Sequence, residues 1–450
     1  MRYLALLLSL LMLMVVGCGD SDTDTPEATA ETPSDSTGEN PTSPESTNPG
    51  SGGTAASGKL AETTKPMLDD VAAFMQKRDY NSAIKTLNEV LRIDPECAEA
   101  HYKRAGILAD IGQNTQALGA FNKAISLDPK NAMIRNTRGF FFLTRGMTGR
   151  ALQDFDEAIK LNPKYVQAYN NRGLAMLSNG NTTAAIADFG VAVRFKPDYV
   201  DAYNNRGFAN SKAGNHDQAI ADFDKALKID PNYTNAYVNR GTVHYQAEKF
   251  PKAIADFTEA IARDPRNVRY YQLRMQTYQK LTMTDEAKQD ANQIVWLTKL
   301  QKLDNAVAAE PKNPTAHIQR AAHLIEGGDD KIALASFEAA IKADPQHGAT
   351  YEQRAQYWFS KGEYDKCIAD CDQALNVAPS IKAFSIRGDA CLKKNDYSGA
   401  IASYTEAKRF DPNVAKAYFL RGQQLKSQGN IEAANKDFAR AYDLDPTLKK

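Results

Sequence analysis

The chain has 450 residues, its 55 lysines and arginines are balanced by 55 aspartates and glutamates, and 42% of its residues are hydrophobic. A single hydrophobic core stops growing at about 250 to 300 residues, so this length requires several domains or an array of repeats. A net charge of zero argues against nucleic acid as a partner, and five cysteines without a CxxC pair exclude a disulfide-stapled scaffold and a zinc-finger framework.

The N-terminal segment 1–17 is typical of a cleaved export signal. A basic start precedes the mostly apolar run 4–16, which is shorter than the roughly 20 residues that a helix needs to span a bilayer. The letters VVGC, which end at Cys18, resemble the bacterial lipoprotein box. This resemblance implies that Cys18 becomes lipidated and anchors the exported protein to a membrane; an ordinary signal peptide with a chance cysteine is the alternative. Gly19 stands where an aspartate would indicate inner-membrane retention, which favours the outer membrane.

Residues 18–63 are predicted to form a disordered acidic tether. Serine, threonine, proline and glycine dominate this segment, and its acidic residues outnumber its lysines. Leu60 is its only large aliphatic residue, so the segment cannot bury enough apolar surface to offset the entropy lost on ordering. We therefore expect no secondary structure before residue 64.

From residue 64 the sequence repeats with a period of 34. Prolines recur at this spacing, with one spacing of 33 and one insertion of 12, at positions 95, 129, 163, 197, 231, 265, 311, 345, 379, 412 and 446. With proline written as position 32, eleven repeats begin at residues 64, 98, 132, 166, 200, 234, 268, 314, 348, 381 and 415. A fixed period of this size predicts a solenoid.

Within each repeat the pattern predicts an antiparallel pair of helices. Positions 8 and 20 are mostly glycine or alanine, which permits close helix approach, and position 24 is mostly phenylalanine. Glycine or asparagine near position 15 indicates a turn, and proline at position 32 ends the second helix. The pattern resembles the tetratricopeptide repeat family. That resemblance implies an all-α, right-handed superhelix, an α-solenoid of about eleven helical hairpins, whose first helices line a concave groove that binds peptides or proteins.

Arginine occupies position 7 in ten of the eleven repeats, and aspartate often occupies position 23. A ligand-binding basic stripe is one interpretation, but the recurrence of both residue types favours a structural ladder of ion pairs between the two helices. Exposed pairs contribute only about 0.2–1 kcal/mol each, so such a ladder would fix register more than it stabilises. The predicted pairs are Arg138 with Asp154, Arg172 with Asp188, Arg206 with Asp222, and Arg240 with Asp256.

If the family geometry holds, positions 2, 5, 9, 12 and 13 line the groove. In repeats 3 to 5 these positions combine asparagines with apolar residues, a mixture that can hydrogen-bond an extended peptide and hold its apolar side chains. Merely solvated helix faces are the alternative. The residues predicted to bind in the groove are Asn136, Phe140, Asn170, Leu174, Asn204, Phe208, Thr242, Tyr245, Gln272 and Gln276.

The 12 inserted residues follow the seventh repeat. No glycine or proline occurs from Thr284 to Glu310, and apolar residues recur there at helical spacing, which predicts one second helix of about 27 residues. We therefore expect two blocks, 64–313 and 314–450, with an offset or hinge between them. Trp296 in this segment is either an interface anchor or a packing residue.

No catalytic or metal-binding residue is predicted, and no cofactor is expected. Cys367, Cys371 and Cys391 could form an envelope disulfide or a soft-metal site, but they occupy core positions of the repeat, where free cysteine packs as a small apolar residue. The six histidines form no ligand pair, and no nucleophile and base motif is present.

Together these patterns predict a non-enzymatic scaffold, exported and lipid-anchored in the bacterial cell envelope, that binds protein or peptide partners in the groove. The alternative is an accessory protein of polysaccharide export or cell-wall synthesis that contacts glycan or a synthase complex. An enzyme would need a large polar pocket with converging titratable groups.

Overall fold

The computed structural model describes residues 55–449, and it describes their side chains from Thr63 onward. The export signal, Cys18 and the tether up to residue 54 lie outside the described residues. Within 55–449 all regular elements are helices, which confirms the all-α repeat predicted from the sequence. None of these helices is both long and apolar enough to cross a lipid bilayer. The chain divides into two compact bodies, an N-terminal body ending at Asp290 and a C-terminal body beginning at Ala291.

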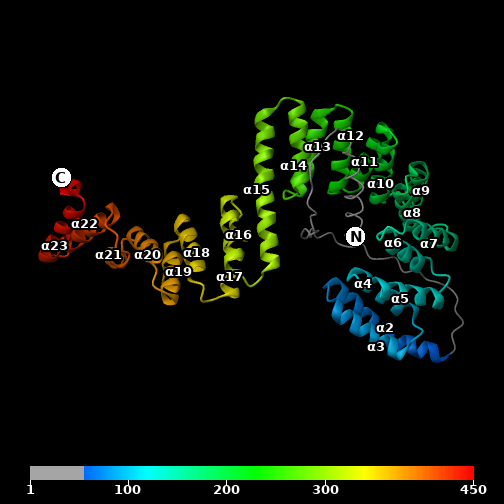
Figure 1. Ribbon diagram of the computed structural model, residues 1–450, viewed down its shortest axis with the longest axis horizontal. Helices are drawn as coiled ribbons and strands as arrows, with labels where there is room; N and C mark the ends of the chain where they lie inside the picture. The colour runs from blue at the N-terminus through cyan, green and yellow to red at the C-terminus, as the bar shows by residue number, and fades with distance from the viewer. Residues whose placement is uncertain (1–54, 450) are drawn as a thin grey trace, which may run out of the picture. The chain divides into compact units, whose positions relative to one another are not determined.

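In the N-terminal body each repeat is a hairpin of two antiparallel helices, and consecutive hairpins stack side by side (Figure 1). The first helices are α2 (Ala55–Gln76), α4 (Ala98–Asp110), α6 (Ala132–Leu143), α8 (Val166–Ser178), α10 (Val200–Lys212), α12 (Thr234–Gln246) and α14 (Val268–Lys280). The second helices are α3 (Tyr80–Ile93), α5 (Asn114–Leu127), α7 (Thr148–Leu161), α9 (Thr182–Phe195), α11 (His216–Ile229), α13 (Phe250–Arg263) and the start of α15 (Thr284–Ala309).

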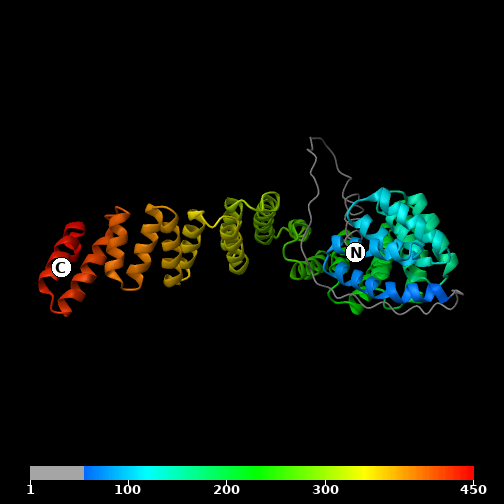
Figure 2. The ribbon, with the colours of Figure 1, turned by 90° about the horizontal axis from the view of Figure 1, so that it is seen from below.

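The C-terminal body continues the same hairpin pattern (Figure 2). It contains the end of α15, then α16 (Pro314–Glu326), α17 (Asp330–Ala343), α18 (Gly348–Ser360), α19 (Tyr364–Val377), α20 (Ile381–Lys393), α21 (Tyr397–Glu406), α22 (Pro412–Ser427), α23 (Ile431–Leu444) and the 3-10 helix η1 (Pro446–Lys449). α15 is a single helix of 26 residues and ends one residue before the expected boundary.

The turn inside every hairpin has a residue in the left-handed conformation at position 15. Glycine adopts this conformation without a side-chain penalty, which explains why it recurs at this place in the sequence. The glycines are Gly112, Gly146, Gly180, Gly214, Gly328, Gly362 and Gly429. The remaining turns use Arg78, Glu248, Thr282 and Asn395.

The core of the N-terminal body is built from a phenylalanine of the second helix that packs on a glycine of the first. At Gly207, for example, an added Cβ would lie 2.7 Å from Cε1 of Phe223, whose side chain is fully buried. The same contact recurs between Gly139 and Phe155, Gly173 and Phe189, and Gly241 and Phe257. Small residues at position 8 thus let the two helices approach until the ring touches the opposite backbone.

In five repeats the residue at position 4 binds the first helix to the loop before it. Tyr169 donates its hydroxyl to the carbonyl of Pro163 at 3.2 Å, and Tyr271 does the same toward Pro265 at 3.1 Å. His317 replaces the tyrosine in repeat 8, and its Nε2 lies 2.9 Å from the carbonyl oxygen of Pro311. Tyrosine and histidine therefore serve one purpose, because each satisfies a loop carbonyl that proline leaves without a helical partner.

Two helix boundaries differ from the prediction. α2 begins at Ala55, inside the segment expected to have no secondary structure, because alanine, leucine, glutamate and lysine in this stretch favour a helix despite its polar composition. α22 begins at Pro412, three residues before the repeat start at 415, so this proline begins a first helix instead of only ending the second helix before it. The carboxylate of Asp411 accepts a hydrogen bond from the backbone N–H of Asn413 at 2.9 Å and so caps α22 early.

Candidate functional site

Asparagine side chains link the first helices of repeats 3 to 6 in what we call the asparagine ladder. Each Nδ2 group donates to the Oδ1 of an asparagine 35 residues earlier, on the preceding first helix. The pairs are Asn171 to Asn136 at 3.0 Å, Asn205 to Asn170 at 2.9 Å, and Asn239 to Asn204 at 2.9 Å. Buried amides need such partners, so the ladder fixes how neighbouring first helices align.

Half of the residues predicted to line an open groove are buried, which corrects the prediction for them. Asn136, Asn170 and Asn204 are 7%, 1% and 0% exposed, so they do not form an open surface for a peptide. Leu174 and Phe208 are also buried, because both pack into the hydrophobic core of the N-terminal body. These five residues hold adjacent repeats together, since positions 5 and 9 lie where neighbouring first helices meet.

The other predicted groove residues are more accessible. Phe140, Thr242 and Tyr245 are half-buried, and the ring of Tyr245 packs edge-on against Phe250 with centroids 5.6 Å apart. The remaining pair, Gln272 and Gln276 on α14, is exposed. Of the ten, this pair alone presents open polar side chains on a first helix.

A row of tyrosines that we did not predict accompanies the ladder. We call Tyr165, Tyr199 and Tyr233 the tyrosine row; they directly precede α8, α10 and α12. Tyr233 donates its hydroxyl to Oδ1 of Asp201 on α10 at 2.7 Å. Burial raises the pKa of Tyr165 to about 12 and also raises the pKa values of Tyr199 and Tyr233. At neutral pH all three hydroxyls therefore remain protonated and can donate hydrogen bonds.

The arginines at position 7 pair with the aspartates at position 23. Arg172 shows the geometry: Nε and Nη2 bind the two carboxylate oxygens of Asp188 at 2.7 and 2.8 Å. The other pairs are Arg138 with Asp154 at 2.6 Å, Arg206 with Asp222 at 2.6 Å, and Arg240 with Asp256 at 2.5 Å. The four aspartate side chains are at most 8% exposed. This geometry engages the guanidinium groups inside the protein instead of presenting them to a ligand.

Several arginines also reach the preceding repeat, a contact that the repeat pattern did not predict. Nη1 of Arg172 binds Asp156 on α7 at 2.8 Å, and Nη1 of Arg240 binds Asp224 on α11 at 2.5 Å. Each of these two partners lies 16 residues before its arginine. The aspartate at position 23 lies 16 residues after the same arginine. One arginine thus bridges two consecutive second helices, and its hydrogen bond to Asp188 raises the pKa of Arg172 further.

Family comparisons agree with this architecture in both bodies. Models described as tetratricopeptide repeat match residues 71–132, 200–233, 234–267 and 415–448, and a model described as TPR repeat matches 142–180 and 388–426. Together these matches cover about half of the chain. The chain belongs to the tetratricopeptide repeat family.

Individual relatives of this repeat protein match only part of it. A DnaJ homolog subfamily C member 7 homolog from Dictyostelium discoideum is 37% identical over 79 residues, which are 16% of this chain. The chain spans 15% of the length of that relative. The structure of Pseudomonas aeruginosa pilF is 19% identical and covers 48% of this chain and 99% of its own, with a TM-score of 0.44. A tetratricopeptide repeat protein from Parabacteroides merdae is 22% identical and covers 52% and 92%, with a TM-score of 0.43.

Trp296 packs inside the C-terminal body. Its ring stacks on the imidazole of His323 with centroids 5.0 Å apart, and its carbonyl oxygen lies 2.9 Å from Nε2 of that histidine. The indole also covers Gly327, where an added Cβ would lie 2.1 Å from Cζ2 of Trp296. Gly327 therefore leaves room for the tryptophan against the end of α16.

The cysteines of the C-terminal body are core residues. Cys367, Cys371 and Cys391 are free thiols that are at most 1% exposed. The hydrogen bond with Cys367 and burial both raise the pKa of Cys371, so this thiol stays protonated. Within residues 63–449 there is no group of three or more histidine, cysteine, aspartate or glutamate side chains that could hold a metal ion.

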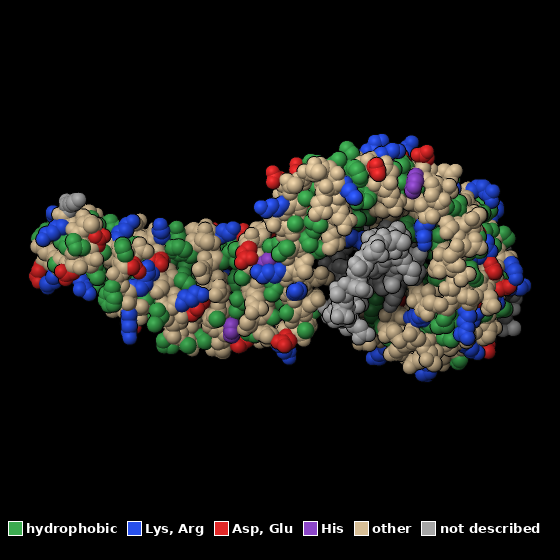
Figure 3. Space-filling model, turned by 45° about the horizontal axis from the view of Figure 1, so that its top comes forward, with side chains coloured by type: hydrophobic (Ala, Val, Ile, Leu, Met, Phe, Trp, Pro, Cys, Tyr) green, Lys and Arg blue, Asp and Glu red, His purple; other side chains and the backbone are tan. Residues whose placement is uncertain are grey.

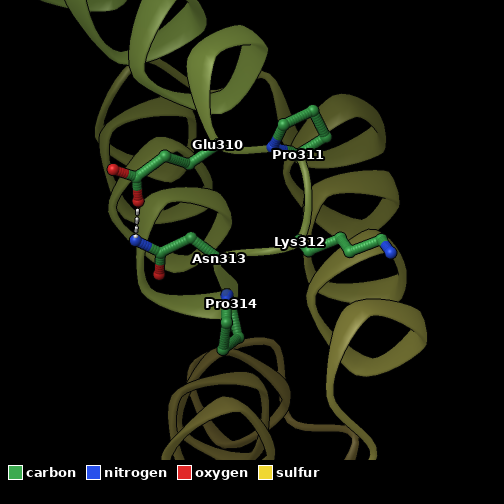
Figure 4. A pocket seen from close by; sticks show the side chains of 5 residues that line it. All are labelled: Glu310, Pro311, Lys312, Asn313 and Pro314. Atoms are coloured by element: carbon green, nitrogen blue, oxygen red, sulfur yellow. Dashed lines mark hydrogen bonds between the residues drawn. The ribbon is translucent and has the colours of Figure 1, made fainter.

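A depression in the C-terminal body lies beside the loop that joins α15 to α16 (Figure 4). It is lined by five consecutive residues, Glu310–Pro314. The side-chain amide of Asn313 donates to Glu310 at 2.6 Å, and its Oδ1 caps α16 through the N–H of Thr315 at 3.0 Å. These groups complete a helix start, so the depression has the features of a capping loop and not of a catalytic site.

Proposed function

We propose that this tetratricopeptide repeat protein is a non-enzymatic scaffold that binds protein or peptide partners along the first helices of its N-terminal body. The observation that carries the proposal is the pair of exposed glutamines on α14, Gln272 and Gln276, which present open polar side chains on a first helix. A glutamine side chain can both donate and accept hydrogen bonds, so this pair suits the backbone of an extended peptide. The hydroxyl of Tyr233 is already engaged by Asp201 and is not a free donor.

Repeats 3 to 6 form a rigid block, because the asparagine ladder holds each of them to the next and the arginine pairs add further contacts. A preformed surface loses little conformational entropy when a partner binds, which favours recognition by many modest contacts. Figure 3 shows apolar, basic and acidic side chains interspersed over the visible surface, so neither positive nor negative charge dominates that face. Neutral hydrogen-bonding groups would then decide which segments bind.

Photo-crosslinking at two exposed positions tests the proposal. A photoreactive amino acid replaces either Gln276 on the first helix of repeat 7 or Lys288 on its second helix, both of which are exposed. We expect partners from the native envelope to crosslink from position 276 and not from position 288. Changing Gln272 to alanine should weaken the crosslinking from position 276 while circular dichroism stays unchanged. Equal crosslinking at both positions, or none, would overturn the proposal.

We also propose that the protein is exported and lipid-anchored through Cys18 in the bacterial cell envelope, with the outer membrane favoured. The support is the signal-like segment and the lipoprotein box in the sequence. Cys18→Ser in the full chain should prevent fatty-acid incorporation and shift the protein from the membrane fraction to the soluble fraction. Unchanged labelling and fractionation would contradict this assignment.

A further inference from the structure

Repeat 10, in the C-terminal body, departs from the regular hairpin. Its second helix, α21, has 10 residues and ends at Glu406, whereas its neighbours α19 and α23 each have 14. The chain leaves the helix at Lys408, which has a left-handed φ of 53°. The segment that would form the last helical turn therefore runs as a loop up to Asp411.

This departure exposes an aromatic ring. Phe410 is 68% exposed. Phe195, which occupies the same position in repeat 4, is only 42% exposed. Ile381, the first residue of α20, is 65% exposed. Two large apolar side chains of the same repeat thus face solvent, where each would be more stable if covered.

The two apolar residues lie at the same edge of the repeat, because α20 begins at Ile381 and the antiparallel α21 ends four residues before Phe410. Nη1 of Arg409 donates to the carbonyl of Ser385 on α20 at 3.3 Å, which places the residue before Phe410 alongside that helix. Ser385 lies one helical turn, about 6 Å, after Ile381. The first helices α20 and α22 are neighbours in the stack (Figure 1).

Among the described residues, the charged groups without an ion pair at this edge are three lysines and two acids. Lys382, Lys408 and Lys416 are exposed, and none of them forms an ion pair within the described part of the chain. The nearby acids Asp389 and Asp411 are both bound by Arg409, at 2.8 and 2.5 Å. The two acids that remain are Glu406, which is exposed, and Glu352, which is half-buried and accepts a hydrogen bond from the hydroxyl of Ser380.

We propose that this edge, made of Ile381, Lys382, Lys408, Phe410 and Lys416, binds an anionic lipid surface. Exposed apolar side chains next to unpaired lysines are the combination that attaches proteins to membrane interfaces, because rings and aliphatic groups enter the headgroup region while ammonium groups meet lipid phosphates. Lysine stems reach outward and keep the charge in water. The edge would give the C-terminal body a membrane contact of its own, independent of Cys18.

Fluorescence quenching in vesicles tests this proposal on the full-length chain. Phe410→Trp places an indole on the edge, and Val295→Trp places one at a control site that is 69% exposed in the same body. The unsubstituted protein, which contains Trp296 and Trp358, supplies the background. Each protein is mixed with phosphatidylcholine vesicles carrying bromine on their acyl chains, with or without phosphatidylglycerol.

We expect quenching of the indole at position 410 only in vesicles that contain phosphatidylglycerol, and loss of that quenching at high salt. In the full chain with Cys18→Ser, whose membrane binding does not depend on a lipid anchor, changing Lys382, Lys408 and Lys416 together to glutamine should lower membrane partitioning by roughly 100-fold, since each basic residue near an anionic surface contributes about fivefold. No quenching at position 410, or equal quenching at positions 410 and 295, would overturn the proposal. An acidic protein as the true partner would give the first of these results.

Discussion

Replacing glycine by alanine should have opposite effects on stability at two positions of the N-terminal body. At Gly207 on α10 the new Cβ would lie 2.7 Å from Cε1 of Phe223 and 3.0 Å from two further ring carbons. At Gly190 on α9 the nearest atom is 3.9 Å away, on Arg206. Both substitutions gain about 1 kcal/mol of helix propensity. At Gly207 overpacking costs about 1–3 kcal/mol, and the fully buried ring places it toward the upper limit.

We therefore expect Gly207→Ala to destabilise its repeat by about 1–2 kcal/mol and Gly190→Ala to stabilise its own by up to about 1 kcal/mol. A long repeat array does not unfold in one step, so hydrogen exchange of peptides from α9, α10 and α11 is a better measure than one global melting curve. A second substitution, Phe223→Leu, should restore protection to the Gly207→Ala variant by making room. Equal protection in the two single variants would refute the steric argument.

Four further substitutions test other contacts. Asp188→Asn should lower the free energy of unfolding by about 1.5–3 kcal/mol, because it weakens a nearly buried charged hydrogen bond. Asp156→Asn should lower it by less than about 1 kcal/mol, because that side chain is 50% exposed. Equal losses of stability in thermal unfolding would contradict this difference. Burial lowers the pKa of His244 from its usual 6.5, so the folded protein resists protonation and stability should fall as the pH drops below about 6.5. His244→Gln should reduce this dependence, and identical melting temperatures of the native protein at pH 7.5 and 5.5 would argue against it. Gly327→Ala should displace the indole of Trp296, which a red shift in tryptophan fluorescence would report.

The fold could be predicted in detail because the contacts that determine it are local and recur in most repeats. Glycine at position 8, phenylalanine at position 24 and proline at position 32 each report one contact, and the period places these contacts in every hairpin. The boundary at α22 could not be predicted, since it depends on the cap at Asp411 and on the pairing of Arg409 with Asp389 in the preceding first helix. Such pairings leave no periodic signal in the sequence.

The candidate site was only partly predictable for a related reason. A position within a repeat says which face of its helix a residue occupies, but burial depends on the neighbouring repeat. Asn170 shows this, because its partner Asn205 is 35 residues away on α10, and this pairing turns an expected surface residue into a buried one. Tyr199 was missed because the last position of the repeat belongs to the loop between hairpins, which the helix pattern does not cover. Its signal was tyrosine at the same position in three consecutive repeats.

The constant offset of the asparagine ladder has a consequence for how this array can change in length. Removal of the whole repeat 166–199 would bring Asn205 opposite Asn136 and Arg206 opposite Asp156, so the bonds that repeat 4 makes would re-form with its successor. Tandem duplication of the same segment would likewise create a new rung with the same geometry. A deletion whose length is not a whole number of repeats would leave buried amides without partners. Whole repeats can therefore be added or removed between repeats 3 and 6 while the hydrogen bonds between neighbouring first helices are kept.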